Sequence, residues 1–149
     1  MWLESSSFGN DAVIPKRHTC DGDNLSPPLR WGDVPGDARS LAIICVDPDA
    51  PNGAFYHWAA CNIAVSKDGL AEAEAATKAF AQGVNDFGKT GYGGPCPPQG
   101  DRPHHYEFRL LALSKDRLAV AARPSCRLVE RAARESLLEE ASLVGLYSR

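Results

Sequence analysis

The sequence predicts a mainly β fold, built as a single domain over residues 1–149. Three segments carry this prediction. Residues 40–46 are a continuous apolar run of strand length, whereas residues 57–63 and 104–113 read as strands in which alternate side chains share a face. Helix-forming sequence is confined to two short stretches. A chain of this length can bury a core of its own, and no internal repeat or second domain is visible.

The N-terminal part reads as short extended pieces separated by turns. Trp2-Leu3 is expected to form an edge strand, and residues 13–15 are extended because a residue before proline avoids the α region. Residues 19–28 contain Asp-Gly and Pro-Pro and are therefore rich in turns. The next piece, residues 29–31, is again extended.

The second buried strand, residues 57–63, places a histidine in an apolar row. Period-two alternation assigns His57, Ala59, Cys61 and Ile63 to one face. We therefore expect His57 to point inward.

Helical propensity and capping point to two helices. The Ala-, Glu- and Lys-rich residues 71–80 favour a short helix. Ser125 is a good N-cap for a second helix, whose apolar stripe is expected to run from Leu128 to Ala141. A final short strand is expected over residues 143–147.

Two carboxylates emerge where the strand 40–46 ends. Asp47 and Asp49 stand in Asp-Pro-Asp-Ala-Pro, and Pro48 and Pro51 stiffen this turn, which leads back to His57. An acid and an imidazole held by a stiff backbone indicate a small polar pocket. The structural alternative is that the two aspartates only cap a turn and that His57 is a satisfied core histidine.

The strand 104–113 and the loop before it complete the candidate site. His104 and Tyr106 stand at the rim of a face that becomes apolar, while His105 points the other way. The loop 85–100 is rich in glycine and proline but carries aromatic residues, which is typical of a functional loop. Its glycines could offer amide donors to a ligand.

These segments give one candidate set, with Trp58 and Tyr92 as possible walls of the pocket. It comprises Asp47, Asp49, His57, His104, Tyr106 and the backbone donors of Gly91 to Gly94. Imidazoles beside carboxylates tend to be protonated. Cationic imidazoles, a phenol and glycine amides suit a small anion such as phosphate or carboxylate.

Three chemical alternatives are weaker on sequence grounds. A zinc site could use two histidines and an aspartate, but no H-E-x-x-H or comparable spacing is present. A serine hydrolase would need a motif such as G-x-S-x-G, which is absent. Cys96 and His104 could imitate a nucleophile pair, yet the prolines around Cys96 favour a structural cysteine. A hydrolase using His57 or His104 as a base stays open.

Composition narrows the class of partner. The net charge is −3 and has no basic run, which argues against nucleic-acid binding. No apolar stretch approaches a membrane span, and the N-terminus has no signal-peptide pattern. Five cysteines without a C-x-x-C pair favour reduced thiols in a cytoplasmic protein, and a single disulfide, for example through Cys20, stays open.

The motifs resemble those of the phosphatidylethanolamine-binding protein family, also called the Raf kinase inhibitor protein family, and most closely its bacterial and archaeal branch. The matching blocks follow one another along most of the chain. They are T-C-D-G-x-N-L-S-P-P-L from residue 19, D-P-D-A-P from 47 with H-W from 57, N-D-F-G from 85, G-Y-G-G-P-C-P-P from 91, H-x-Y from 104 and L-V-G-L-Y from 143.

The resemblance implies a large, mostly antiparallel central sheet packed on a smaller sheet, with a few peripheral helices including one near the C-terminus. It also implies a surface pocket for phosphate-bearing head groups or small anions. Carried over by motif, and joined to the Gly94 amide, the expected ligand-binding residues are Asp47, Asp49, His57, Gly94, Pro95, Pro97, His104 and Tyr106.

The expected function is therefore non-enzymatic binding of an anionic or phosphorylated ligand, without metal or cofactor. The alternative is a protein-interaction module that inhibits a kinase or protease. A homodimer is plausible from the bacterial relatives. Residues 71–80 depart from the family pattern, because this segment is often a loop there.

Overall fold

The computed structural model describes all residues 1–149 and has nine strands in two sheets. The smaller sheet has the strand order β1-β3-β6 and is formed by β1 (Trp2–Glu4), β3 (Leu29–Gly32) and β6 (Gly69–Leu70). The larger sheet has the order β2-β9-β8-β4-β5-β7. Its strands are β2 (Ala12–Val13), β4 (Ser40–Asp47), β5 (Phe55–Ile63), β7 (Ala81–Gln82), β8 (His104–Leu113) and β9 (Leu137–Tyr147).

Every strand pair is antiparallel except β2 with β9, so the predicted mainly β fold is confirmed. Helical structure is limited to one α-helix, α1 (Cys126–Arg134), and two 3-10 turns, η1 (Lys16–His18) and η2 (Glu74–Ala76). No helix is long and apolar enough to cross a membrane.

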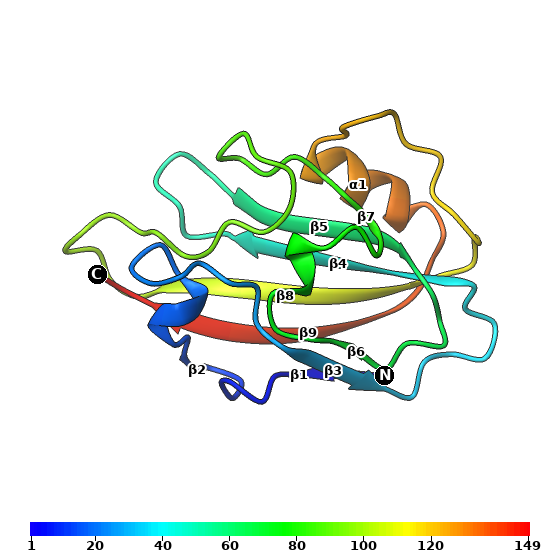
Figure 1. The fold of residues 1–149 in the computed structure, drawn as a ribbon, viewed down its shortest axis with the longest axis horizontal. Helices are drawn as coiled ribbons and strands as arrows, with labels where there is room; N and C mark the ends of the chain where they lie inside the picture. Colours follow the sequence, from blue (N-terminus) through cyan, green and yellow to red (C-terminus); the bar gives the residue numbers. More distant parts are fainter.

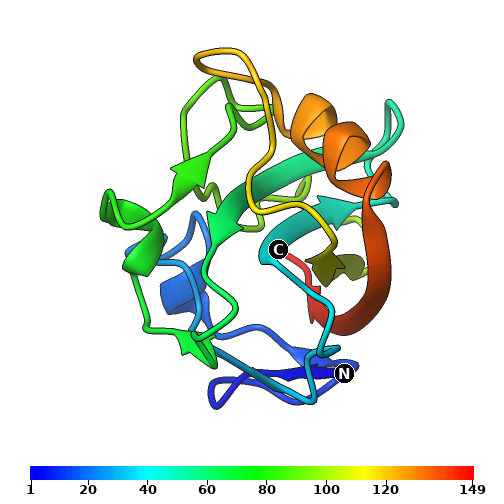
Figure 2. The same ribbon diagram turned by 90° about the vertical axis from the view of Figure 1, so that its right-hand side faces the viewer.

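The large sheet lies between two hydrophobic clusters. In both views α1 is at the top and β1 and β3 are at the bottom, with the large sheet between them (Figures 1 and 2). The larger cluster joins β4, β5, β8 and β9 to the small sheet through residues such as Trp31, Ile43 and Phe108. The second cluster joins the other face to α1 through residues such as Ile44 and Val129. Strand β4 is buried along its whole length because it contributes to both clusters.

A network of charged groups also lies on the α1 face of the large sheet. It is called the helix-side network below and consists of Tyr56, Glu107, Arg109, Glu130 and Arg134. Glu130 is buried and accepts hydrogen bonds from the Tyr56 hydroxyl, from Arg109 at 3.1 Å and from Arg134 at 2.9 Å. Each charge in this network is therefore matched by a partner of opposite sign or by a hydrogen bond.

Two β-bulges in β5 correct the predicted alternation of its side chains. Cys45 pairs with Trp58 but Val46 pairs with Tyr56, so His57 is an extra residue on the β5 side. A bulge of this kind places two successive side chains on one face. His57 therefore shares a face with Trp58, whereas Ala59 faces α1.

The second bulge lies near the end of β5 and moves Ile63 to the face opposite to the one that strict alternation predicts. Leu41 pairs with Ile63 and Ile43 with Ala60, and Asn62 between them has φ 57°. Ile63 consequently belongs to the cluster under the small sheet, not to the row of Ala59 and Cys61. The predicted single apolar row is wrong because strict period two holds only without bulges.

The predicted helix over residues 71–80 is also wrong. Only Glu74–Ala76 forms a 3-10 turn, and Ala73 before it is left-handed with φ 65°. Tertiary hydrogen bonds hold this segment, since Ala73 N donates to Ser26 O and the Gln82 side chain donates to Ala75 O. A short segment with high propensity but no apolar stripe gains little from forming a helix.

The helix near the C-terminus is confirmed, but its length was overestimated. Ser125 caps it by accepting a hydrogen bond from Leu128 N at 3.2 Å. The helix ends at Arg134, and the expected later members of its stripe lie in β9, which begins at Leu137. Pairing with the whole of β8 provides the hydrogen-bond partners of the β9 backbone. The side chains of Ala141, Leu143 and Tyr147, on alternate positions of β9, are buried in the core.

Candidate functional site

The candidate site lies where β4 ends and β5 and β8 begin, at the left end of Figure 1, where the loops and the C-terminus gather. Strand β4 delivers Asp47, β5 delivers His57, and β8 delivers His104 and Tyr106. These segments are far apart in the chain. Antiparallel pairing of β4 with both neighbours brings them to one edge of the sheet.

A cavity of about 190 Å³ opens at this position. Five of the predicted site residues line it, together with residues from the segments 50–55 and 87–98. The lining residues are Asp47, Ala50, Pro51, Phe55, His57, Phe87, Cys96, Pro97, Pro98, His104 and Tyr106. The volume is below the roughly 300–1,000 Å³ of sites for drug-sized ligands and suits a small head group.

A hydrogen-bonded row of three side chains forms the charged part of the site. His104 Nδ1 lies 2.7 Å from Asp47 Oδ2, and His104 Nε2 lies 3.0 Å from Asp101 Oδ2. Burial alone would lower the pKa of His104, but its hydrogen bonds with the two carboxylates outweigh this, and the pKa is raised. The imidazolium of His104 therefore balances the buried charge of Asp47.

His57 has a different protonation state from the one expected. Its Nδ1 donates to the carbonyl oxygen of Gly93 at 2.7 Å, so the proton sits on Nδ1 and Nε2 carries a lone pair. Burial lowers the pKa of His57, and its hydrogen bond to Gly93 only partly offsets that effect. The expectation that both imidazoles are protonated is thus wrong, because of these two histidines His104 contacts carboxylates directly, whereas His57 contacts a backbone carbonyl.

Two polar atoms in the cavity have no hydrogen-bond partner in the protein: Nε2 of His57 and the hydroxyl oxygen of Tyr106. Neither is sealed from solvent. The two rings meet edge to face at 5.2 Å between centroids. Burial and the nearby carboxylate of Asp47 raise the pKa of Tyr106, so its hydroxyl stays protonated and can donate.

Three of the predicted site residues do not line the cavity. The carboxylate of Asp49 points to the next groove, where it accepts hydrogen bonds from the amide and Nδ1 of His105, both at 2.7 Å. Gly94 and Pro95 lie behind the cavity. The Gly94 amide donates to Asn24 Oδ1 at 2.8 Å, and Pro95 O accepts from the Cys20 amide at 3.1 Å.

The glycine amides of the loop 85–100 are largely engaged within the protein. Gly91 N donates to Gly83 O, and Gly93 N donates to His57 O. Trp58 and Tyr92, expected as walls, are instead packed against each other in the interior, with centroids 5.7 Å apart. These groups position the cavity from behind and do not face it.

The walls come from residues that the sequence did not assign to the site. Phe55 and Phe87 stack edge to face at 4.8 Å, and both contact the ring of His57. Phe55 stands two residues before His57, so alternation alone could have found it. Phe87 belongs to the loop already noted for its aromatic residues, while no sequence signal marks Asp101 as a partner of His104.

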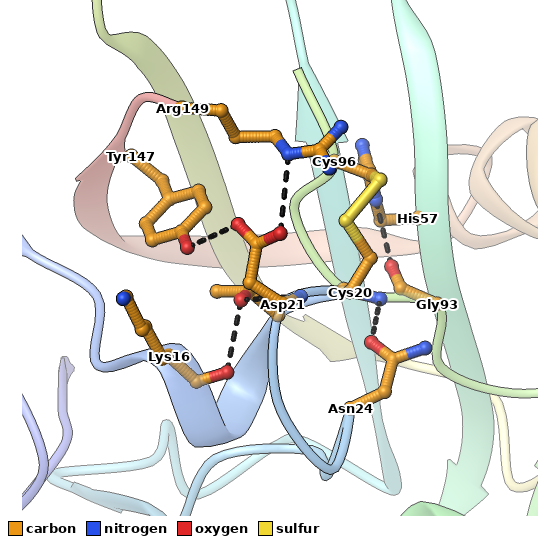
Figure 3. The surroundings of a disulfide bond; sticks show 11 residues. Lys16, Cys20, Asp21, Asn24, His57, Gly93, Cys96, Tyr147 and Arg149 are labelled. Atoms are coloured by element: carbon orange, nitrogen blue, oxygen red, sulfur yellow. Dashed lines mark hydrogen bonds and ion pairs between the residues drawn. A yellow bond between two sulfur atoms is a disulfide. The ribbon is translucent and has the colours of Figure 1, made fainter. Parts of the chain in front are cut away.

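A disulfide joins Cys20 to Cys96 and lies beside the cavity (Figure 3). This corrects the expectation of reduced thiols for these two cysteines. Cys45, Cys61 and Cys126 are free and buried. Figure 3 also shows Asp21 between Tyr147 and Arg149, and Tyr147 donates to Asp21 at 2.6 Å. The segment carrying Cys20 is therefore anchored to the C-terminal end of β9.

Comparison with known proteins gives matches along the whole chain. A family model described as phosphatidylethanolamine-binding protein matches residues 4–148. The UPF0098 protein of Methanothermobacter thermautotrophicus is 46% identical over 153 residues, which covers 100% of this chain and 99% of the relative. The UPF0098 protein of Aquifex aeolicus is 42% identical over 152 residues, with coverage of 100% and 89%.

A solved structure shares the fold. Escherichia coli YbcL, described as a new member of the mammalian PEBP family, matches with a TM-score of 0.94 and 31% sequence identity. The match covers 99% of this chain and 98% of YbcL. The large sheet, the small sheet and the C-terminal helix are therefore arranged as in that protein.

Proposed function

The chain belongs to the phosphatidylethanolamine-binding protein family, and on this premise we propose that it is a non-enzymatic binding protein for a small anionic or phosphorylated ligand. The proposed binding site is the cavity formed by Asp47, His57, Pro97, His104 and Tyr106. Asp49, Gly94 and Pro95, also expected as ligand contacts, are proposed to support this site from outside the cavity.

One observation carries the proposal: two polar atoms converge on the cavity without a protein partner. Buried polar groups are almost always hydrogen-bonded, so open ones in a cleft are available for a ligand or water. The hydroxyl of Tyr106 can donate directly to a phosphate oxygen. His57 Nε2 can accept a hydrogen bond from a protonated phosphate or take up its proton and then donate.

The charges nearby set a condition on the ligand. Asp47 alone would repel an anion, but His104 balances it at 2.7 Å. Both oxygens of Asp47 are already occupied, one by His104 and the other by the Asp49 amide at 2.8 Å. Asp101 also contacts His104, so the three groups together carry a formal net charge of −1 before binding, which favours a phosphate that brings its own proton.

The surroundings favour binding over turnover. Cys96 is held in the disulfide, and no serine, threonine or lysine lines the cavity. The raised pKa of Tyr106 keeps its phenol from acting as a nucleophile near neutral pH. Phe55, Phe87 and the prolines offer apolar contact to the part of the ligand next to the phosphate.

The proposal is tested by NMR titration of the labelled protein with inorganic phosphate and with ethyl phosphate. Tyr106→Phe removes one oxygen, and His57→Asn keeps a side-chain donor for Gly93 O while removing Nε2. We expect each variant to weaken binding roughly tenfold, as for the loss of one hydrogen bond to a charged group. Equal affinities in the wild type and both variants would reject this cavity as the site.

A matched control is Tyr56→Phe, which also removes a single hydroxyl. Tyr56 belongs to the helix-side network on the other face of the sheet, where it donates to Glu130. Its loss should leave phosphate affinity unchanged. A panel of phosphate esters and carboxylic esters, incubated with the wild type, checks the non-enzymatic assignment, because sustained product release would contradict it.

A protein partner, such as a kinase or protease, is the second candidate. The feature that favours it is Phe87, a large apolar side chain that is 46% exposed at the mouth of the cavity. Affinity capture from a lysate of the source organism with wild type and Phe87→Ser tests it. A stoichiometric partner that only the wild type retains would favour this candidate, and equal capture would reject it.

Two further expectations stay predictions. The expected cytoplasmic location rests on reduced cysteines, and the Cys20–Cys96 bond removes that argument. A homodimer is testable by sedimentation equilibrium. The proposal for the cavity does not depend on either of them.

A further inference from the structure

We propose that the Cys20–Cys96 disulfide is a thiol-reactive site that controls the cavity: reduction by a small dithiol loosens the cavity wall and weakens ligand binding. The inference rests on the proposed function for its ligand readout. It also makes a separate structural claim, that the segment behind the cavity becomes mobile when the bond opens.

Among the cysteines of this chain, the two in the disulfide are the ones that a reagent in solution can reach. Cys20 is exposed and Cys96 is half-buried, and Cys96 also lines the cavity. The three free cysteines are buried. Burial raises the pKa of each of their thiols, that of Cys126 to about 12, so they are poor nucleophiles. A small thiol in solution therefore meets the disulfide first.

The bond is coupled to the site through the segment 92–98, called the rear segment below. At its start, Gly93 O fixes the ring of His57. At its end, Pro97 and Pro98 wall the cavity. Cys96 lies between these two contacts along the chain, so a change at its sulfur acts on both the acceptor that orients His57 and the wall beside it. Figure 3 shows Cys96 joined to Cys20, together with His57 and its acceptor Gly93.

The rear segment is held in place by the segment that carries Cys20. The Gly94 amide donates to Asn24 Oδ1 at 2.8 Å, and the Tyr92 hydroxyl donates to His18 O at 2.6 Å. The Cys20 amide donates to Pro95 O at 3.1 Å. These hydrogen bonds remain after reduction. We therefore expect local loosening and not unfolding.

The covalent step balances as an ordinary thiol–disulfide exchange. One thiolate of the dithiol attacks Sγ of exposed Cys20, the S–S bond breaks, and Cys96 leaves as a thiolate that takes up a proton. The second thiol of the reagent then displaces Cys20 and closes its own disulfide. The protein gains two electrons and two protons, and the dithiol loses them.

Two consequences follow for an anionic ligand. The rear segment must be ordered again on binding, which costs affinity. The Cys96 thiol is also released beside the cavity, and any thiolate formed there repels an anion. We expect the dissociation constant for inorganic phosphate to rise roughly tenfold on reduction.

The experiment compares the labelled protein in dithiothreitol with the same protein in oxidised dithiothreitol, which differs by two hydrogens and cannot reduce the bond. Mass spectrometry after iodoacetamide treatment counts the free thiols in each state. NMR titration with inorganic phosphate gives the dissociation constants. Hydrogen exchange of the Gly93 and Gly94 amides reports the order of the rear segment without any ligand.

The variant Cys20→Ser removes the disulfide without a reducing agent and so tests the same claim independently. It should bind phosphate as weakly as the reduced wild type, and it should not respond to dithiothreitol. Native amide shifts for β4 and β8 establish that the variant is folded. Removal of dithiothreitol and reoxidation of the wild type should restore both the affinity and the slow exchange.

The outcomes separate the two proposals. The redox control would be overturned if the reduced protein has two more free thiols than the oxidised protein but binds phosphate with the same affinity. Failure of dithiothreitol to open the bond in the folded protein would overturn it as well. If the oxidised protein shows no saturable phosphate shifts, the proposed function fails. Faster exchange of Gly94 on reduction would then still support the structural claim, and unchanged exchange would overturn it.

Discussion

The large sheet buries polar side chains on both of its faces, and the two groups differ in one respect. In the helix-side network, Glu130 accepts from Tyr56, Arg109 and Arg134. On the opposite face, Asp47, His57, Asp101, His104 and Tyr106 form what is called the cavity cluster below. The two polar atoms of this cluster that face the cavity without a protein partner are His57 Nε2 and the Tyr106 hydroxyl oxygen. Buried charge therefore does not by itself identify a site. Open hydrogen-bonding capacity beside a cavity does.

The largest expected effect is a loss of stability when the helix-side network is broken, with phosphate binding unchanged. Glu130→Ala leaves Arg109 and Arg134 without their shared partner, and Glu130 is only 8% exposed. Arg109 keeps Glu107 and Arg134 keeps Glu140 as ion-pair partners, but the hydrogen bonds from three side chains to a buried carboxylate are lost. We therefore expect a loss of about 3 kcal/mol in the free energy of unfolding, measured by urea denaturation. Phosphate affinity should not change. A parallel loss of affinity would show that the two faces are coupled.

The next effect concerns the backbone support of the cavity. In Gly94→Ala the new Cβ would lie 2.2 Å from His18 O and 2.5 Å from Asn24 Oδ1, so the rear segment must shift. We expect a loss of about 2 kcal/mol in stability, together with weaker phosphate binding. Gly36→Ala is the control, since nothing lies within 4 Å of a Cβ there. Equal behaviour of both variants would contradict the tight packing described for Gly94.

A smaller effect is the pH dependence of phosphate binding. Burial lowers the pKa of free His57, and a bound anion beside Nε2 should raise it. Affinity is then greatest below the pKa of the free histidine and falls as pH rises through the pKa of the complex, by at most about tenfold per pH unit. Calorimetric titration at several pH values measures this. Affinity that rises with pH would contradict the assigned role of His57.

The smallest effect sharpens the contrast between the two site histidines. Asp101→Asn removes one of the carboxylates that raise the pKa of His104, so this pKa should fall, as followed by NMR of the imidazole protons. The stabilisation from His104 is fully present below its unfolded pKa of about 6.5 and is lost as pH rises through the folded value. Because the folded-state pKa of His104 is lower in Asp101→Asn, the variant should lose this stabilisation at a lower pH than the wild type. His57 should titrate unchanged.

Much of the fold could be predicted because its signals are local. The buried run of β4, the alternation of β8 and the Ser125 cap each lie within one element, and each was found in the structure. The segment 71–80 was misassigned because its hydrogen bonds to Ser26 and Gln82 are tertiary. Propensity cannot register such bonds.

The site could be predicted only to the level of its strands. Strand ends and family motifs brought Asp47, His57, His104 and Tyr106 together, but their protonation depended on neighbours that no motif names. Asp101 comes from a loop, and the lowered pKa of His57 comes from burial under Phe55 and Phe87. The pairing of Cys20 with Cys96 joins residues 76 positions apart and was beyond any local pattern.

The bulge at His57 has a consequence for anyone who would transplant this site. Copying the His-Trp dipeptide into a regular strand would send the imidazole and the indole to opposite sides, and only one of them could reach its partners. Likewise, deleting a single residue between Phe55 and Trp58 would empty the cavity of its imidazole while leaving the composition of the strand almost untouched. The number of residues between Phe55 and Trp58 decides which face of the sheet carries His57. An insertion or deletion here should therefore impair the site more than most substitutions do.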